Sequence, residues 1–107
     1  MGVPQITIID NASDARYEVR LDEELAGFLQ YRSHPELIEL VHTEIDEEFE
    51  GRGLGSQLIS FALNDARERG LAVLPFCPFV NDYIQRHLRY ADLVPEGRRG
   101  EFGLGAG

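Results

Sequence analysis

The sequence predicts an α/β fold of the α+β type, with a mixed, mostly antiparallel sheet and two helices. Three segments within residues 5–31 alternate between apolar and polar side chains, as strands do. After Leu54 the apolar residues recur every three or four positions, as they do in an amphipathic helix. A glycine-rich loop, residues 51–55, joins these two regions. Because a strand, such a loop, a helix and a second strand form a right-handed crossover unit, a parallel strand pair is expected to follow the antiparallel strands.

The first half of the chain contains four expected strands. They cover residues 5–9, 16–21, 25–31 and 36–45. Residues 11–14 and 22–24 have the composition of turns, so the first three strands are expected to pair as hairpins. Gly27 weakens the third strand.

Residues 36–45 are expected to form a central strand. Apolar side chains occur on both faces of this segment, which is typical of a strand that is covered on both sides. Strict alternation places four side chains on one face: Ile38, Leu40, His42 and Glu44. The last two then lie at the carboxyl end of the strand, beside the glycine-rich loop.

The second half of the chain alternates helix and strand. The apolar stripe that begins at Leu54 predicts a long helix, which Gly70 ends in a left-handed conformation. A strand is expected over residues 71–76, a second helix over residues 80–88 and a short strand or extended segment over residues 90–94. Residues 1–94 therefore form one expected domain, and the glycine-rich tail, residues 95–107, is expected to be flexible.

Composition excludes several classes of protein. The chain has 107 residues, and its 10 basic and 19 acidic side chains give a net charge of −9, which argues against binding to nucleic acid. One cysteine cannot form an internal disulfide or a thiolate zinc cluster, and we expect no metal site. We find no apolar stretch of about 20 residues and no basic segment followed by an apolar run at the start. We therefore expect a cytoplasmic protein with no membrane partner.

The loop between strand and helix is the most informative motif. Gly51, Gly53 and Gly55 are spaced by one residue, which lets a ligand approach the backbone closely. The first turn of the helix that follows presents unpaired amide groups, and this geometry suits a pyrophosphate. The loop is neither a P-loop nor a dinucleotide fingerprint, because Gly55 is followed by Ser56 and Gln57. The alternative is that the glycines only make a tight connection between strand and helix.

This loop, followed by an amphipathic helix, resembles the coenzyme A loop of GNAT-type N-acetyltransferases, whose pattern is Gln/Arg-x-x-Gly-x-Gly/Ala. An ordered set of segments resembles a family of very small, single-domain GNAT-like proteins over about residues 6–94. The set comprises residues 42–44, 50–55, 77–79, 83–84 and 90–94. The resemblance implies an acetyl-CoA-dependent N-acetyltransferase that acts on an unknown amine, either a small molecule or a protein. The alternative is a non-catalytic module that binds coenzyme A or acyl-coenzyme A and acts through a protein partner. The sequence does not define the oligomeric state.

The resemblance also implies which residues bind the coenzyme. Backbone amides of six residues would hold the pyrophosphate: Gly51, Arg52, Gly53, Leu54, Gly55 and Ser56. The splayed strand ends at Ile45 and Leu74 would admit the pantetheine arm. Asn81 matches an asparagine of many members, and we include Tyr83 in the coenzyme site. Arg86 can reach the 3′-phosphate of the coenzyme or simply face solvent.

The chain departs from the family pattern at two positions. Glu50 stands where the superfamily usually has Gln or Arg, so any side-chain contribution to phosphate binding shifts to Arg52. Leu88 stands where many members have the tyrosine that protonates the departing thiolate. The acidic side chains near the loop can attract a cationic amine, or they form a solvated turn: Asp46, Glu47, Glu48 and Glu50.

Three residues are candidates for catalysis. His42 and Glu44 can accept the proton of the amine, directly or through water, or they are a packed histidine and a solvated glutamate. Cys77 precedes the start of a helix, a setting that favours the thiolate form. It can accept the acetyl group or act as an acid near the coenzyme sulfur, or it is a small buried hydrophobe. Tyr83 and Tyr90 are alternative proton donors or packing residues.

Overall fold

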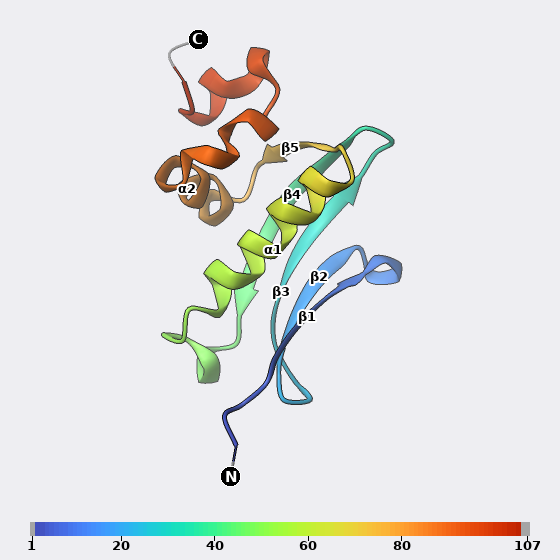
Figure 1. The fold of residues 1–107 in the computed structure, drawn as a ribbon, viewed down its shortest axis with the longest axis vertical. Coiled ribbons are helices and arrows are strands. Elements are labelled where there is room, and N and C mark those ends of the chain that lie inside the picture. Colours follow the sequence, from blue (N-terminus) through green and yellow to red (C-terminus); the bar gives the residue numbers. More distant parts are fainter. Residues whose placement is uncertain (1, 106–107) are drawn as a thin grey trace.

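The computed structural model describes residues 2–105 and contains five strands and two α-helices within that range (Figure 1). The strands are β1 (Ile6–Asn11), β2 (Arg16–Leu21), β3 (Glu24–Ser33), β4 (Leu37–Ile45) and β5 (Ala72–Pro75). The helices are α1 (Leu54–Glu68) and α2 (Pro78–Arg86). Short 3-10 helices cover Ala12–Asp14, Glu47–Phe49, Leu88–Leu93 and Glu96–Phe102.

The five strands form one sheet in the order β1-β2-β3-β4-β5. The first three neighbouring pairs are antiparallel, and β4 pairs with β5 in parallel. Helix α1 joins the two parallel strands and crosses the sheet diagonally, with α2 beside it (Figure 1). The prediction of a mixed, mostly antiparallel sheet with one crossover unit is therefore confirmed.

The hydrophobic core lies between the sheet and helix α1. The predicted apolar stripe of α1 is buried: Leu54, Leu58, Ile59, Ala62, Leu63 and Ala66. Tyr17 and Leu29 face it from β2 and β3 and are fully buried. After the helix, Gly70 adopts the left-handed conformation with φ of 68°, and the amide of Leu71 donates to the carbonyl of Ala66. This is the glycine-based helix ending that the sequence predicts.

A β-bulge in β4 changes which side chains share a face. Gln30 is paired with His42 and the next residue, Tyr31, with Leu40, so Val41 is an extra residue in β4. Ile38 and Leu40 therefore point into the core, whereas His42 lies against Phe28 on the opposite face. The expectation that these side chains and Glu44 share one face is wrong, because strict alternation does not anticipate the bulge. The strand itself is an interior strand between β3 and β5, as its apolar residues predict.

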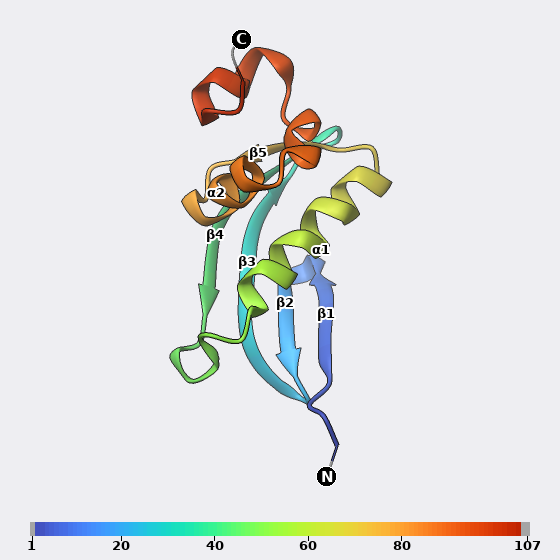
Figure 2. The same cartoon turned by 60° about the vertical axis from the view of Figure 1, so that its left-hand side comes forward.

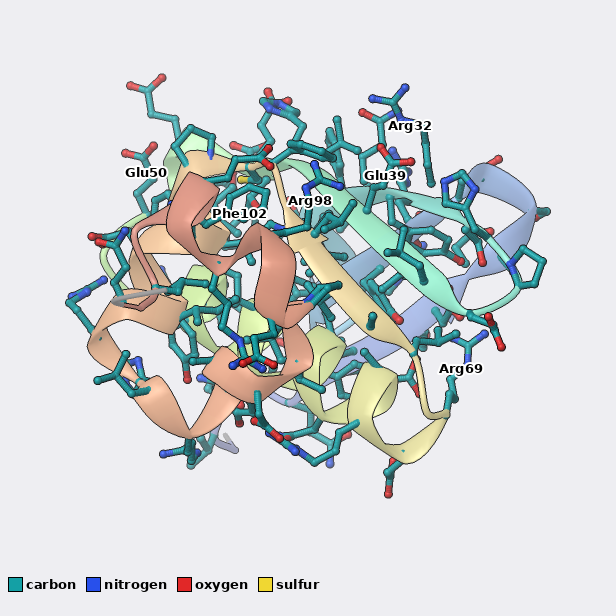
Figure 3. All side chains as sticks on the ribbon, turned by 90° about the horizontal axis from the view of Figure 1, so that it is seen from above. Arg32, Glu39, Glu50, Arg69, Arg98 and Phe102 are labelled. Atoms are coloured by element: carbon teal, nitrogen blue, oxygen red, sulfur yellow. The ribbon has the colours of Figure 1, made fainter. Side chains whose placement is uncertain are left out.

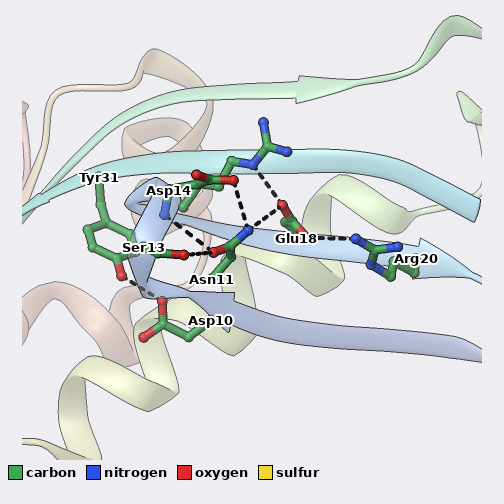
Figure 4. A network of polar contacts seen from close by, with 8 residues as sticks. Asp10, Asn11, Ser13, Asp14, Glu18, Arg20 and Tyr31 are labelled. Atoms are coloured by element: carbon green, nitrogen blue, oxygen red, sulfur yellow. Dashed lines mark hydrogen bonds and ion pairs between the residues drawn. The ribbon is translucent and has the colours of Figure 1, made fainter.

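A charged cluster lies on the sheet face opposite the helices (Figure 4). Glu18 is only 1% exposed, although it is acidic. Its carboxylate accepts hydrogen bonds from Asn11 at 3.0 Å, from Arg16 at 2.8 Å and from Arg20 at 3.0 Å. The Asn11 amide and the two guanidinium groups together lower the pKa of Glu18, although burial opposes this shift.

The segment after α2 differs from the expectations. Residues 90–94 do not extend into a strand, because residues 88–93 form a 3-10 helix that buries Tyr90 and Leu93. The helix expected over residues 80–88 begins at Pro78 instead, where Cys77 is extended and proline occupies the first turn.

The C-terminal segment, residues 95–105, also differs from the expectation of a flexible tail. Phe102 and Leu104 are buried, and the Phe102 ring packs edge-on against Phe76 with centroids 5.6 Å apart. The side-chain amide of Gln85 donates to the carbonyl of Phe102 at 2.9 Å. Figure 3 shows Phe102 on this segment, next to β5. The glycine content of this segment suggested flexibility, whereas Phe102 and Leu104 anchor it to the core. Residues 106–107 of the expected tail lie outside the described residues.

Within the part of the chain that the structure describes, no helix has the length and apolar character needed to span a membrane.

Candidate functional site

The glycine loop adopts the backbone conformation that its glycines permit. Gly51 and Gly53 have φ of 81° and 74°, in the left-handed region, and Gly53 is the N-cap of α1. A Cβ atom added at either position would meet nothing within 4 Å. The left-handed backbone at Gly51 and Gly53 therefore favours glycine, and the space beside these two residues is open to a ligand.

A cavity of about 460 Å³ lies between this loop, the end of β4 and helix α2. Six of the predicted coenzyme residues line it: Ile45, Gly51, Gly53, Leu54, Gly55 and Ser56. The first turn of α1 faces the cavity without a side-chain cap, so its amide groups can donate to a ligand. Arg52 does not line the cavity, and its guanidinium lies 5.8 Å from the centroid of the Phe49 ring.

The cavity runs along a part of β4 that β5 does not cover. Pairing between the two strands ends at Leu40 and Pro75, and the amide of Cys77 makes the last bond to the Leu40 carbonyl at 2.8 Å. Residues 41–45 therefore have no strand beside them on this edge. The expected opening at Leu74 is wrong, because Leu74 is buried and still pairs with Glu39. The two strands diverge only after Pro75.

Gly55 forms the floor of the cavity between two apolar side chains. A Cβ atom there would lie 3.7 Å from Cγ1 of Ile45 and 3.7 Å from the ring of Phe79. Phe79 is 55% exposed although it is a large apolar residue, and it forms the wall that α2 contributes. Phe79 belongs to the segment 77–79 of the family resemblance but is not among the expected site residues. The sequence feature that could have identified it as a site residue is its position directly after Cys77 and Pro78, at the start of the second helix.

Cys77 lies behind the cavity wall. It is 3% exposed, and its Sγ is 3.2 Å from Oγ1 of Thr43, a residue that lines the cavity. Thr43, which is also in the family resemblance but not among the expected site residues, therefore lies between the thiol and the cavity.

The other two candidates for catalysis lie at the uncovered edge of β4. Glu44 lines the cavity, and its carboxylate is 3.3 Å from Nε2 of His42. Both side chains are more than half exposed. The structure thus pairs these two residues and separates them from Cys77, which lies on the helix side of β4.

The remaining predicted coenzyme residues lie outside the cavity lining. Oδ1 of Asn81 is buried and has no hydrogen-bond partner among the described residues. The Tyr83 ring stacks on His87 with centroids 4.0 Å apart and borders a separate, shallower hollow on α1. Arg86 forms an exposed ion pair with Asp82 at 3.0 Å. Within residues 2–105, no group of three or more His, Cys, Asp or Glu side chains is placed to hold a metal ion.

The fold is similar to that of two solved structures. One is Ard1 from Thermoplasma volcanium, with a TM-score of 0.50 and 21% identity over 57% of this chain and 43% of that chain. The other is ribosomal-protein-alanine N-acetyltransferase from Brucella melitensis biovar Abortus 2308, with a TM-score of 0.54 and 17% identity over 68% of this chain and 78% of that chain. The chain thus spans less than half the length of the Ard1 chain. These matches show that the chain shares its fold with Ard1 and with that N-acetyltransferase.

The family follows from a second comparison. The model described as GCN5-related N-acetyl-transferase matches residues 16–93, which include β4, the glycine loop and both helices. The chain therefore belongs to the GCN5-related N-acetyltransferase family, as the resemblance indicated.

Proposed function

We propose that this protein binds acetyl-CoA in the 460 Å³ cavity and transfers the acetyl group to an amine. One observation carries the proposal. The left-handed glycines lead directly into the uncapped N-terminus of α1, and this terminus opens onto the cavity beside the unpaired edge of β4. Helix N-termini bind phosphate groups through their free amides and the helix dipole. Asp46, Glu47 and Glu48 do not line the cavity, whereas Glu50 does, so in this proposal the exposed Glu50 carboxylate turns toward water while neutral backbone donors hold the pyrophosphate.

Two features fit the pantetheine arm. Gly55 leaves an apolar slot between Ile45 and Phe79, wide enough that even a Cβ atom would make only ordinary contacts. Asn81 lies outside the cavity lining but follows Phe79 by two residues on α2, and its buried side-chain oxygen has no donor among the described residues, so an amide N–H of the arm is a chemically suitable partner. The cavity also has the size typical of small-molecule sites.

The chemistry requires a proton acceptor on the amine side. The amine nitrogen attacks the thioester carbonyl carbon, the carbon–sulfur bond breaks, and the amine loses a proton. We assign this role to the His42 and Glu44 pair, and the position of Glu44 in the cavity lining, at the open edge of β4, supports the assignment. Cys77 can supply a proton to the departing thiolate through the Thr43 hydroxyl. Direct attack by Cys77 would require Thr43 to move first.

Calorimetric titration with coenzyme A tests the binding half of the proposal. Gly53→Val places a β-branched side chain at a left-handed position and should abolish binding while the protein stays folded. Gly97→Val is the matched control, because Gly97 has open space around it and no positive φ. Coenzyme affinity in Gly53→Val equal to that of the control would remove the loop from the site.

Consumption of acetyl-CoA across a panel of amines tests the transfer half. We expect turnover with at least one amine, and a lower kcat with an unchanged coenzyme affinity in Glu44→Gln and in Cys77→Ser. Coenzyme A should also protect Cys77 from alkylation if the cavity controls access to the thiol. Tight binding without turnover of any amine would instead indicate a non-catalytic coenzyme A module.

A further inference from the structure

Strand β1 forms an open edge of the sheet. It pairs with β2 on one side, and no described segment lies along its other side (Figure 2). The opposite edge differs, because the C-terminal segment packs Phe102 against Phe76, directly after β5. An edge strand presents free backbone donors and acceptors, which favour pairing with another strand.

The hydrogen bonds of Gln5 show which backbone groups point outward. Its amide donates to the Asp22 carboxylate, and its carbonyl accepts from the Asp22 amide, so Gln5 faces β2. The pairing of β1 with β2 contains no register shift, and the bonding direction of an antiparallel strand alternates along the chain. Three residues of β1 therefore direct both N–H and C=O away from the sheet: Ile6, Ile8 and Asp10.

The side chains around this edge are apolar and largely uncharged. Ile6 and Ile9 are 42% and 41% exposed, and Phe61 on the adjacent face of α1 is 39% exposed. Ile8 and Phe61 line a shallow hollow of about 440 Å³ beside the strand. The only charged residue of the strand is Asp10, which accepts a hydrogen bond from Tyr31 at 2.6 Å and pairs with Arg69. The edge has no proline, bulge or free charge, which are the features that usually prevent strand pairing.

We propose that two copies of this chain pair through β1 in an antiparallel manner, about a twofold axis at Ile8. In this register Ile8 lies opposite Ile8 of the second copy, and Ile6 lies opposite Asp10 of the second copy. All of these residues direct their backbone groups outward, so each facing pair can exchange two hydrogen bonds. The two five-stranded sheets then form one continuous sheet.

The proposed register keeps the one charged residue of β1 away from its own copy in the partner. Each copy carries a net charge of −9, so a stable pair must avoid placing carboxylates opposite one another. In the proposed register, Asp10 faces an isoleucine and Thr7 faces Ile9. The twofold axis is perpendicular to the sheet, so both α1 helices lie on the same face. The hollows beside Ile8 and Phe61 of the two copies then meet and are covered.

The mass in solution tests this proposal, and it is measured without coenzyme, because Ser56 and Tyr83 of the expected coenzyme site also line the hollow. Sedimentation equilibrium of the full chain should give a concentration-dependent mass that approaches twice the 12.1 kDa of the chain. Ile6→Pro removes one outward N–H from each copy and should raise the dissociation constant at least about tenfold. Ile6→Ala keeps this donor and is the control for the lost side chain. A monomer at every concentration would overturn the proposal.

A second pair of variants tests the face that α1 contributes. Phe61→Glu should weaken the dimer, because it places a charge in the covered hollow of each copy. Leu88→Glu introduces the same charge at a residue that is 65% exposed and does not line the hollow, and it should leave the dimer intact. Circular dichroism of each variant monitors folding. A dimer that is insensitive to both Ile6→Pro and Phe61→Glu uses another surface and would contradict the proposed pairing.

Disulfide trapping tests the register. Thr7 and Ile9 of the second copy form a facing pair without hydrogen bonds, with Cα atoms about 4.5 Å apart, which a disulfide can bridge. Oxidation of a mixture of Thr7→Cys and Ile9→Cys chains should give a crosslinked heterodimer. Each variant alone should crosslink far less, because the two introduced cysteines are then offset along the strand. Equal crosslinking in all three samples would exclude the register about Ile8.

Discussion

At the scale of single residues, the polar interior of this protein depends on matched charges. Glu18 is buried on an otherwise open face of the sheet, where its carboxylate oxygens accept bonds from Asn11, Arg16 and Arg20 (Figure 4). Arg16 also lies over the Phe28 ring, 4.8 Å from its centroid. Phe28 in turn contacts His42, so the cluster supports the sheet behind the proposed proton acceptor. A buried carboxylate with this many donors is stable only while it is ionised.

We predict that Glu18→Gln reduces the acid sensitivity of the fold. The pKa of Glu18 is lowered from its ordinary value of 4.5, so its stabilising contribution is present above that pH and is lost as pH falls through the folded-state pKa. At neutral pH the variant should lose about 1–3 kcal/mol of unfolding free energy, because three charge-assisted bonds are weakened. Urea unfolding from pH 7 to pH 3 should show a smaller decline for the variant than for the wild type. Glu23→Gln, at an exposed turn, is the control, and identical pH profiles for all three proteins would contradict the prediction.

At the scale of elements, hydrophobic periodicity predicted the regular helix and strands but not the irregularities within them. The three-to-four spacing after Leu54 located α1 and its buried face, and the glycine pattern located the loop that enters it. Alternation of apolar and polar residues does not reveal the bulge at Val41. Because of this bulge, Thr43 faces the helices and His42 faces away from them. Phe79 was missed for a related reason. An apolar residue at a helix start suggests packing, and only the three-dimensional arrangement shows that it is an exposed wall of the cavity.

Gly27 is a further residue whose role only the structure reveals, because the sequence indicates only that it weakens β3. A Cβ atom there would lie 2.5 Å from both the carbonyl oxygen of Glu44 and Cδ1 of Ile45. The Ile45 side chain can rotate, but the Glu44 carbonyl belongs to the backbone of β4 and cannot move alone. Gly27 therefore lets β3 approach the end of β4 that borders the cavity.

We predict that Gly27→Ala affects stability and coenzyme binding together. Overpacking should cost about 1–3 kcal/mol of unfolding free energy, and the displaced end of β4 should move Ile45 at the cavity wall. Urea unfolding measures the first effect, and titration with coenzyme A should show an affinity lowered several-fold. Gly97→Ala is the control, since its added methyl group meets open space. A variant that loses stability but keeps full coenzyme affinity would show that the end of β4 does not shape the site.

At the scale of the whole molecule, two helices cover one face of a small sheet. The two edge strands, β1 and β5, differ in what packs beside them. Helices α1 and α2 cover the face that carries the core, and the edge at β1 is free to pair (Figure 2). The C-terminal segment packs beside the end of β5, beyond the residues 16–93 that the family model matches. It contributes Phe102 and Leu104 to the core of a chain that has few residues to bury.

We predict that the C-terminal segment stabilises the domain, although its composition suggests a flexible tail. Phe102→Ala removes a buried ring that packs on Phe76 and should lower the unfolding free energy by about 2–4 kcal/mol. Glu101→Ala, the neighbouring control, removes only an exposed ion pair with Arg98 and should leave the unfolding free energy close to that of the wild type. Urea unfolding of the full-length chain measures both. If the two variants unfold alike, the segment contributes no packing and is the flexible tail that its glycines suggest. If Phe102→Ala alone is destabilised, the structural domain of this protein extends past residue 94 and includes the buried residues Phe102 and Leu104.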